Sequence, residues 1–176
     1  MDTSAKTESI VEVVKAVEKE YIVLPEFQRD FVWDIGKTYD LFDSLVKNIF
    51  VGSIIYGVPS FEITTRELDS RPRSGQGSRR KLKITSYKKA EINLKVKTSS
   101  FRLLLDGQQR LTSVVRALTG IDTVWFISKY PNELYQDDSV ASTSLEGLLY
   151  EFSGQESSER LSIKLSDAFE IMFHLN

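Results

Sequence analysis

The sequence predicts a fold that mixes amphipathic helices with short apolar strands. Apolar side chains recur at i, i+3, i+4 and i+7, the spacing of one helix face, in three places: Ile10/Val13/Val14/Val17, Phe42/Leu45/Val46/Ile49 and Leu111/Val114/Val115/Leu118. Two other stretches, 51–63 and 123–128, are rich in β-branched and aromatic residues, as strands are, and 101–106 is a short apolar run that also suits a strand. With 41% hydrophobic and 27% charged residues, the chain can bury a globular core.

The elements follow from these patterns and from local capping signals. Ser9 with Glu12 is a capping-box pattern, and Gly120 is a helix stop. In chain order we expect a helix over 6–20, a helix over 37–49, a strand in 51–63, a mobile basic loop over 66–81, one or two strands in 82–98, a strand over 101–106, a helix over 111–118, a strand over 123–128, and helices over 143–152 and 166–175.

Composition excludes several classes of protein. The chain has no cysteine, so disulfides, thiolate zinc sites and thiol catalysis are ruled out. No apolar run approaches the ~20 residues that span a bilayer, and the first ten residues are polar, so we expect a cytoplasmic protein without a membrane partner. The apolar stripe Phe169, Met172 and Phe173 needs a partner surface, which predicts that the chain is an N-terminal piece of a longer protein.

The stretch "LLLDGQQRLTSVV" places unusual polar residues where a strand becomes a helix. N–H groups and a positive dipole end stabilise an anion at a helix N-terminus. Gly107 permits a close backbone approach, Arg110 offers a planar fork for phosphate, and Asp106 is a candidate ligand for a divalent cation. These residues predict a nucleotide-phosphate site. The alternative is structural: Asp106 caps the helix, Gly107 eases the turn and Arg110 forms a surface ion pair.

A second stretch, "LPEFQRDFVW", also combines glutamine and arginine with aromatic residues. Taken alone, it favours a structural interpretation, in which Phe27, Phe31 and Trp33 belong to the core and Gln28–Arg29 is a solvated tip. Together, P-x-F-Q-R-x-F-x-W and D-G-Q-Q-R closely resemble the N-terminal domain of GmrSD- and SspE-type restriction endonucleases. The resemblance covers roughly residues 8–127.

The resemblance implies an α+β fold similar to ParB and sulfiredoxin, with a small mixed sheet flanked by helices. It divides the chain into an NTP-binding domain over 1–130 and the start of a C-terminal helical region over 131–176. It also implies NTP binding and hydrolysis that regulate restriction of modified phage DNA. An HNH-type nuclease module is expected in cis or on a partner, because the chain's one histidine, His174, does not supply HNH chemistry.

The resemblance and the turn chemistry together suggest a mechanism. Gly107, Gln108 and Arg110 bind the NTP phosphates, and Asp106 coordinates Mg²⁺ or positions the water. Gln109, with Gln28 or Gln108, orients the attacking water, and Arg29 offsets charge that develops on the phosphates. A ParB-like module that binds nucleotide or DNA as a switch, with little hydrolysis, is the alternative.

The basic segment is a candidate DNA-binding loop. Between Arg66 and Lys83 there are seven basic and two acidic side chains, a net charge of +5 that leaves −7 for the rest of the chain. Such a segment contacts DNA phosphates in a salt-dependent way; the alternative is a solvated insertion with no partner. The predicted DNA contacts are Arg71, Arg73, Arg79, Arg80 and Lys81. For the aromatics Trp33, Tyr39, Trp125 and Phe126, we expect core packing rather than base stacking.

Overall fold

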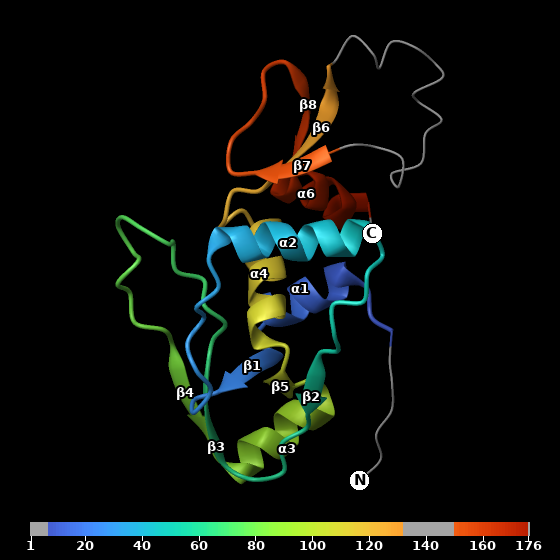
Figure 1. Cartoon of the computed structure of the whole chain (residues 1–176). Helices are drawn as coiled ribbons and strands as arrows, with labels where there is room; N and C mark the ends of the chain where they lie inside the picture. The colour runs from blue at the N-terminus through green and yellow to red at the C-terminus, as the bar shows by residue number, and fades with distance from the viewer. Residues whose placement is uncertain (1–6, 132–149, 176) are drawn as a thin grey trace. The chain divides into compact units, whose positions relative to one another are not determined.

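A computed structural model describes residues 7–131 and 150–175, which divide into two compact units (Figure 1). Unit 1 contains the described residues up to Asp30, together with Ile54–Asp69 and Lys81–Gln108. Unit 2 contains Phe31–Ser53, Ser70–Arg80 and the described residues from Gln109 onward. The backbone therefore passes from one unit to the other inside both sequence motifs.

Unit 1 is built on a mixed five-stranded sheet with the order β2-β5-β1-β3-β4. Its strands are β1 (Ile22–Pro25), β2 (Ile55–Gly57), β3 (Ile63–Arg66), β4 (Ile84–Tyr87) and β5 (Arg102–Asp106). The central pair, β1 and β5, is parallel, and Val23 is in register with Leu103. The other neighbours are antiparallel. Because β1 and β5 run in the same direction, the Gln28 loop and the Asp106 turn leave the sheet at the same edge.

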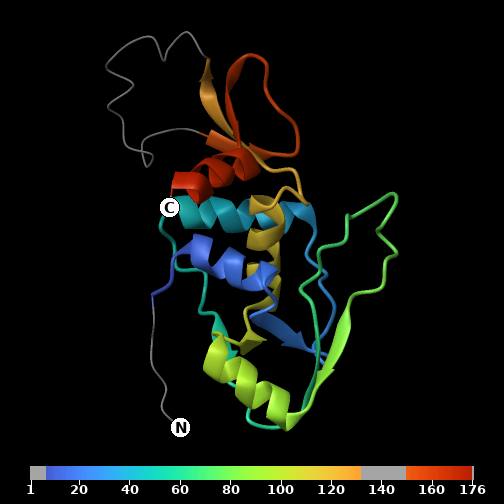
Figure 2. The same ribbon diagram turned by 180° about the vertical axis from the view of Figure 1, so that it is seen from behind.

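Two helices complete unit 1: α1 (Ile10–Glu18) and α3 (Lys89–Thr98). The predicted capping box begins α1, since the Ser9 and Glu12 side chains each bond the other residue's backbone N–H. Helix α3 lies across one face of the sheet (Figure 2), where Ile92 packs in a buried cluster with Val23 and Leu103. These contacts fix the sheet edge that carries both motifs.

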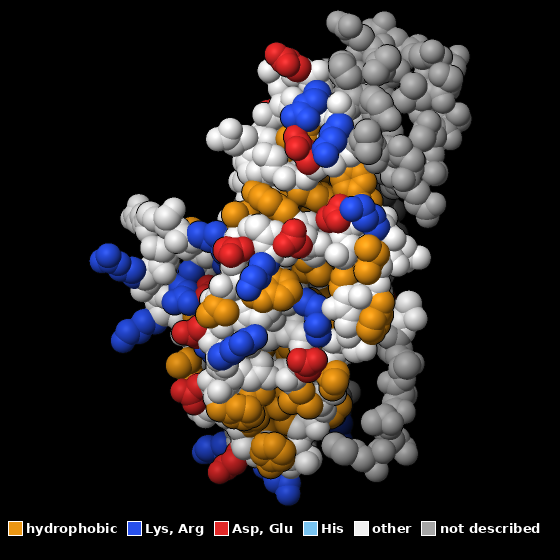
Figure 3. Space-filling model, in the orientation of Figure 1, with side chains coloured by type: hydrophobic (Ala, Val, Ile, Leu, Met, Phe, Trp, Pro, Cys, Tyr) orange, Lys and Arg blue, Asp and Glu red, His pale blue; other side chains and the backbone are white. Residues whose placement is uncertain are grey.

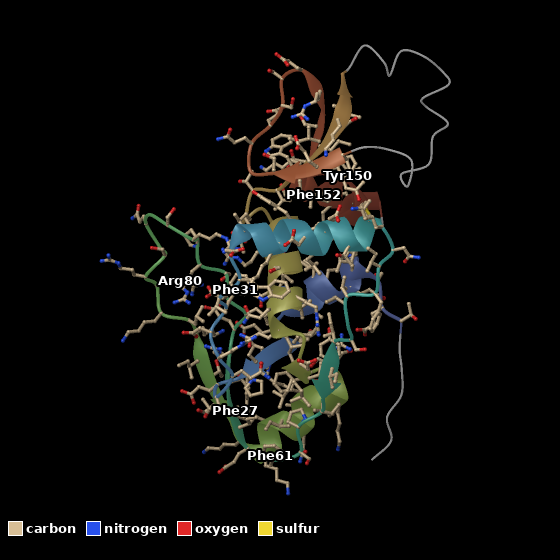
Figure 4. All side chains as sticks on the ribbon, viewed as in Figure 1. Phe27, Phe31, Phe61, Arg80, Tyr150 and Phe152 are labelled. Atoms are coloured by element: carbon tan, nitrogen blue, oxygen red, sulfur yellow. The ribbon has the colours of Figure 1, made fainter. Side chains whose placement is uncertain are left out.

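Unit 2 combines α2 (Ile35–Val46), α4 (Gln108–Leu118) after its first residue, and α6 (Leu165–Leu175) with a second sheet. That sheet has the order β7-β6-β8, formed by β6 (Trp125–Pro131), β7 (Tyr150–Ser153) and β8 (Arg160–Lys164), all antiparallel. Leu41 and Phe42 of α2 pack with Val114 and Ala117 of α4 in the core. Figure 4 shows Tyr150 and Phe152 side by side on β7, and both rings contact Phe126.

The structure confirms the α+β class and the small mixed sheet flanked by helices. It corrects the prediction of strands throughout 82–98, because the second half forms α3. Lysine, glutamate, alanine and leucine favour a helix there, and Ile92 and Val96, four residues apart, both contact the core. The alternation that predicted strands continues only through β4.

The structure corrects two further predictions of secondary structure. The stretch 51–63 contains β2 and the first residue of β3 rather than a continuous strand, because Pro59 lies between them and lacks the N–H that a sheet requires. The helix over 143–152 is wrong at its end, since Tyr150–Ser153 is strand β7, while 143–149 lie outside the described residues. The division at residue 130 stays a prediction. No helix in the described part is both long and apolar enough to cross a bilayer.

Candidate nucleotide site

The D-G-Q-Q-R turn has the predicted strand–turn–helix geometry. Strand β5 ends at Asp106 and helix α4 begins at Gln108. Between them, buried Gly107 has φ 87°, in the left-handed region that disfavours a side chain. The Asp106 carboxylate is exposed at the end of the strand. The turn therefore presents a carboxylate beside a helix N-terminus.

Within unit 1, amide side chains tie the first motif to this turn. Gln28 Nε2 donates to the Leu104 carbonyl at 2.6 Å and to the Leu105 carbonyl at 3.2 Å. In the reverse direction, Gln108 Nε2 donates to the Arg29 carbonyl at 2.8 Å. Two motifs separated by more than seventy residues thus converge through reciprocal side-chain to backbone hydrogen bonds. Arg29 itself is exposed.

Arg66 holds the same loop from the other side. Its buried guanidinium donates to the Gln28 carbonyl at 2.5 Å, to the Arg29 carbonyl and to the Asp30 carboxylate. Sequence reasoning assigned Arg66 to the basic segment and missed this role, because an arginine next to a polar run reads as solvated. The antiparallel pairing of β1 with β3 puts Leu24 opposite Arg66. Only this pairing brings the Arg66 side chain to the loop.

Within unit 2, Gln109 and Arg110 contact different segments. The buried Gln109 Oε1 accepts from the backbone N–H groups of Val32 at 2.9 Å and Trp33 at 3.2 Å. Arg110 Nη2 donates to the Ser53 carbonyl at 2.8 Å. Gly52, at φ 95°, leaves room for this guanidinium: a Cβ there would lie 2.6 Å from Arg110 Nη1. The segment Gly52–Ser53 is therefore a seat for Arg110.

Arg110 also lines a pocket of about 260 Å³ in unit 2. One face of α2 forms much of its wall, because its lining residues on that helix are spaced by three and four positions. The lining combines cationic, acidic, hydroxyl and apolar side chains: Trp33, Lys37, Asp40, Leu41, Ser44, Val51 and Arg110. Sequence patterning indicated Arg110 alone among these as a ligand-binding residue.

Comparison with known protein families decides where this chain belongs. The model of the "GmrSD restriction endonuclease, N-terminal domain" family matches residues 10–174. The chain is a GmrSD N-terminal domain. The match extends well beyond the region that carries the two motifs. The chain also resembles an uncharacterized protein of Methanocaldococcus jannaschii, with 29% identity over 119 residues. That alignment covers 67% of this chain and 18% of the relative, so the chain spans a minor part of that protein's length.

The aromatic residues of the first motif have three different environments in this GmrSD domain. Phe27 is 82% exposed, so the interpretation that places it in the core is wrong; its loop turns outward after Pro25. Figure 4 labels it near Phe61, where Figure 3 shows hydrophobic side chains at the surface. Trp33 and Tyr39 do pack on the unit 2 core. The Phe31 ring lies 5.4 Å from the Arg73 guanidinium and 5.2 Å from that of Arg116.

The basic segment is partly anchored rather than wholly solvated. Arg73 bonds both carboxylate oxygens of Asp122, at 3.0 and 2.8 Å, and the Trp33 carbonyl at 2.6 Å. Arg80 is exposed and donates to Ser70 Oγ at 2.8 Å, so its side chain reaches across the loop (Figure 4). Arg79 and Lys81 are exposed, and Arg71 is half-buried. Arg73 therefore anchors the basic segment to Asp122 and Trp33, a structural role that DNA binding does not require.

Asp122 is the acceptor at the centre of this anchor. It is buried and also accepts from Arg116 at 2.8 and 2.9 Å. Burial alone raises the pKa of the Asp122 carboxyl, but hydrogen bonds from Arg116 and Arg73 outweigh it and lower the pKa below its ordinary value. Two bidentate arginines thus hold one ionised aspartate.

The described residues contain no group of three or more histidine, aspartate or glutamate side chains placed to hold a metal. Magnesium needs no such group when it is bound with a nucleotide, because one or two carboxylates and the phosphate oxygens suffice. The exposed Asp106 carboxylate fits that requirement. His174 is 75% exposed and lies 4.0 Å from Glu170 on α6.

Substituting Gly52 with alanine tests the Arg110 seat. We expect the unfolding free energy to fall about 1–3 kcal/mol further than in Gly75→Ala, since the methyl group displaces a charged hydrogen bond. Gly75 is a matched control: it has φ 76° with nothing within 4 Å of an added Cβ, so both variants carry similar backbone strain. Urea denaturation measures the difference. Equal losses in the two variants would show that the seat has no energetic role.

Proposed function

We propose that this chain is an NTP-binding and hydrolysing sensor domain of a bacterial anti-phage restriction system, in which nucleotide state regulates cleavage of modified DNA. The observation that carries the proposal is the convergence of Gln28–Arg29 with the Asp106–Gln108 turn in unit 1. Membership of the GmrSD family supplies the restriction context. A nuclease module, in cis or on a partner, would perform the cleavage.

The proposed site uses the start of α4. The backbone at Gly107 and Gln108 and the Arg110 guanidinium bind the phosphates, since unpaired N–H groups and a planar fork both favour phosphate oxygens. Asp106 would hold Mg²⁺, and the bound ion would neutralise charge on the phosphates. Arg29, exposed on the loop that Gln108 contacts, offsets charge that develops during hydrolysis.

Gln28 is the best candidate to orient the attacking water. Its Nε2 donates hydrogen bonds to two backbone carbonyls, while its Oε1 accepts no hydrogen bond from the described residues. Gln109 Oε1, by contrast, already accepts two backbone N–H groups, so we assign Gln109 a positioning role. A water held by Gln28 would lie at the edge of the sheet that also carries Asp106.

Phosphate release tests hydrolysis. With Mg²⁺ and GTP, UTP, CTP or ATP, with and without DNA, we expect the wild type to turn over at least one nucleotide. Asp106→Ala and Arg110→Ala should each lower that rate about a hundredfold or more, the usual loss when one transition-state contact is removed. Lys47→Ala, which breaks an exposed pair at the C-terminal end of α2, is the control. Turnover that survives in both variants would exclude the turn as the hydrolytic site.

One observation favours the second candidate, a switch module that binds nucleotide or DNA with little hydrolysis. The amides of Gln28, Gln108 and Gln109 all bond backbone groups, and a purely structural role for them requires no water chemistry. Arg110-dependent nucleotide binding without turnover would support this candidate over the first.

DNA binding by the basic segment is tested with Arg79→Ser/Arg80→Ser. We expect weaker DNA binding and a shallower dependence of log K on log salt, by about 0.9 for each DNA phosphate that the variant no longer neutralises. Arg73 is left in place because it anchors the segment to Asp122. Lys89→Ser/Lys97→Ser on exposed positions of α3 removes the same charge elsewhere. Titrations by fluorescence anisotropy at several salt concentrations that show equal slopes for both double variants would argue for a solvated insertion.

A further inference from the structure

The unit 2 pocket has a polar wall and an apolar wall. Lys37, Asp40 and Ser44 share one face of α2 and form the polar wall. The seven helical steps from Lys37 to Ser44 make this wall about 10 Å long. Trp33, Leu41 and Val51 supply apolar surface. At about 260 Å³, the pocket lies just below the 300–1,000 Å³ typical of sites for drug-sized ligands. It suits part of a nucleotide rather than the whole molecule.

The charges in this pocket point to the kind of ligand. Arg110 is held by the Ser53 carbonyl, so its guanidinium is positioned before a ligand arrives. Among the described residues, neither the Lys37 ammonium nor the Asp40 carboxylate has a hydrogen-bonding or ion-pair partner. Two cations favour an anion, and one carboxylate accepts hydrogen bonds only. A flat ring with an N–H donor, attached to a negatively charged group, satisfies all of these side chains.

We propose that this pocket is the nucleoside subsite of the NTP site, with the base against Trp33, an amino group of the base donating to Asp40, and the phosphate end facing Lys37 and Arg110. This rests on the proposed function, which places the phosphates at Arg110. Asp40 then decides which bases bind. Cytosine presents an N4 amino donor, whereas uracil presents a carbonyl acceptor at the same position. The pocket therefore prefers CTP to UTP.

Binding titrations of this matched pair test the subsite. In Trp125→Phe protein, Trp33 is the sole remaining tryptophan, so its fluorescence reports on the pocket. We expect CTP to quench Trp33 and inorganic triphosphate to bind without quenching it. CTP should bind at least about tenfold more tightly than UTP, since a hydrogen bond to a charged group is worth that much. Calorimetry on the wild type gives the same ratio without relying on the Trp125 variant.

Variants of α2 complete the experiment. Asp40→Asn should bring the CTP to UTP ratio close to one, because an amide can donate to uracil as well as accept from cytosine. Asp43→Asn, which alters the exposed pair with Lys47 outside the pocket, should leave the ratio unchanged. Arg110-dependent binding that is equal for CTP, UTP and triphosphate would overturn the subsite and leave the proposed function standing. Absence of binding for all three would overturn both.

Discussion

Asp122→Asn is expected to lower the free energy of unfolding by about 3–5 kcal/mol, the cost of breaking a buried ion pair while its partner stays in place. Arg116 is 2% exposed and bonds both carboxylate oxygens of Asp122. Asparagine keeps the shape but removes the charge, so it leaves that guanidinium uncompensated beside Phe31. Arg73 loses its ion pair with Asp122 in the same step and keeps only its bond to the Trp33 carbonyl, so the basic segment should loosen.

Chemical denaturation of the wild type and the variant measures this loss. Asp43→Asn is the matched control, because it removes one charge from an exposed i,i+4 pair and should change stability by less than about 1 kcal/mol. A loss for Asp122→Asn no larger than the control's would mean that the two arginines are satisfied without the carboxylate.

The pH dependence of stability provides an independent check on the same carboxylate. The pKa of Asp122 is lowered in the folded protein, so its contribution is complete above the ordinary aspartate pKa of about 3.9. It is lost as the pH falls through the lower folded value. The difference between the wild type and Asp122→Asn should therefore be constant near neutral pH and shrink below about pH 4.

Sequence patterns predicted the elements whose burial is periodic. The D-G-Q-Q-R turn lies between a buried strand and an amphipathic helix, and both patterns are strong enough to place Gly107 at the junction. Helix α3 was missed because only Ile92 is buried on it, so its apolar face is too narrow to outweigh the local alternation. The exposure of Phe27 could not be predicted from the sequence either, since an aromatic residue in an alternating run predicts burial.

Sequence reasoning predicted which residue types the candidate site contains, but it did not predict their contacts. Chemistry alone indicates that Arg110 suits phosphate, but its seat at Gly52–Ser53 and the neighbouring Lys37 and Asp40 depend on how α2 packs. The assignment of glutamines to water chemistry stays a prediction, and the structure adds that Gln28, Gln108 and Gln109 bond backbone groups. Such side-chain to backbone bonds have no sequence period, so a single sequence cannot reveal them.

Arg66→Met is expected to release the Gln28–Asp30 loop of unit 1. One guanidinium donates to two backbone carbonyls and a carboxylate in this loop, and methionine supplies none of these bonds. Hydrogen bonds from a charged donor contribute about 1.5–3 kcal/mol each when well formed. Because the Asp30 side chain is 65% exposed, water replaces part of this contribution, and we expect a total loss of about 2–3 kcal/mol.

The local consequence separates Arg66 from an ordinary surface charge. The Gln28 N–H bonds the Pro25 carbonyl in the native loop, and its hydrogen exchange should accelerate in Arg66→Met. Trypsin cleavage after Arg29 should accelerate with it, because an opened loop fits a protease. Lys83→Met is the matched control, since Lys83 pairs with Glu20 at the surface. Unchanged protection at Gln28 in Arg66→Met would mean that the amide bonds of Gln28 and Gln108 hold the loop without the guanidinium. In that case, the loss of Gln28 itself should open it.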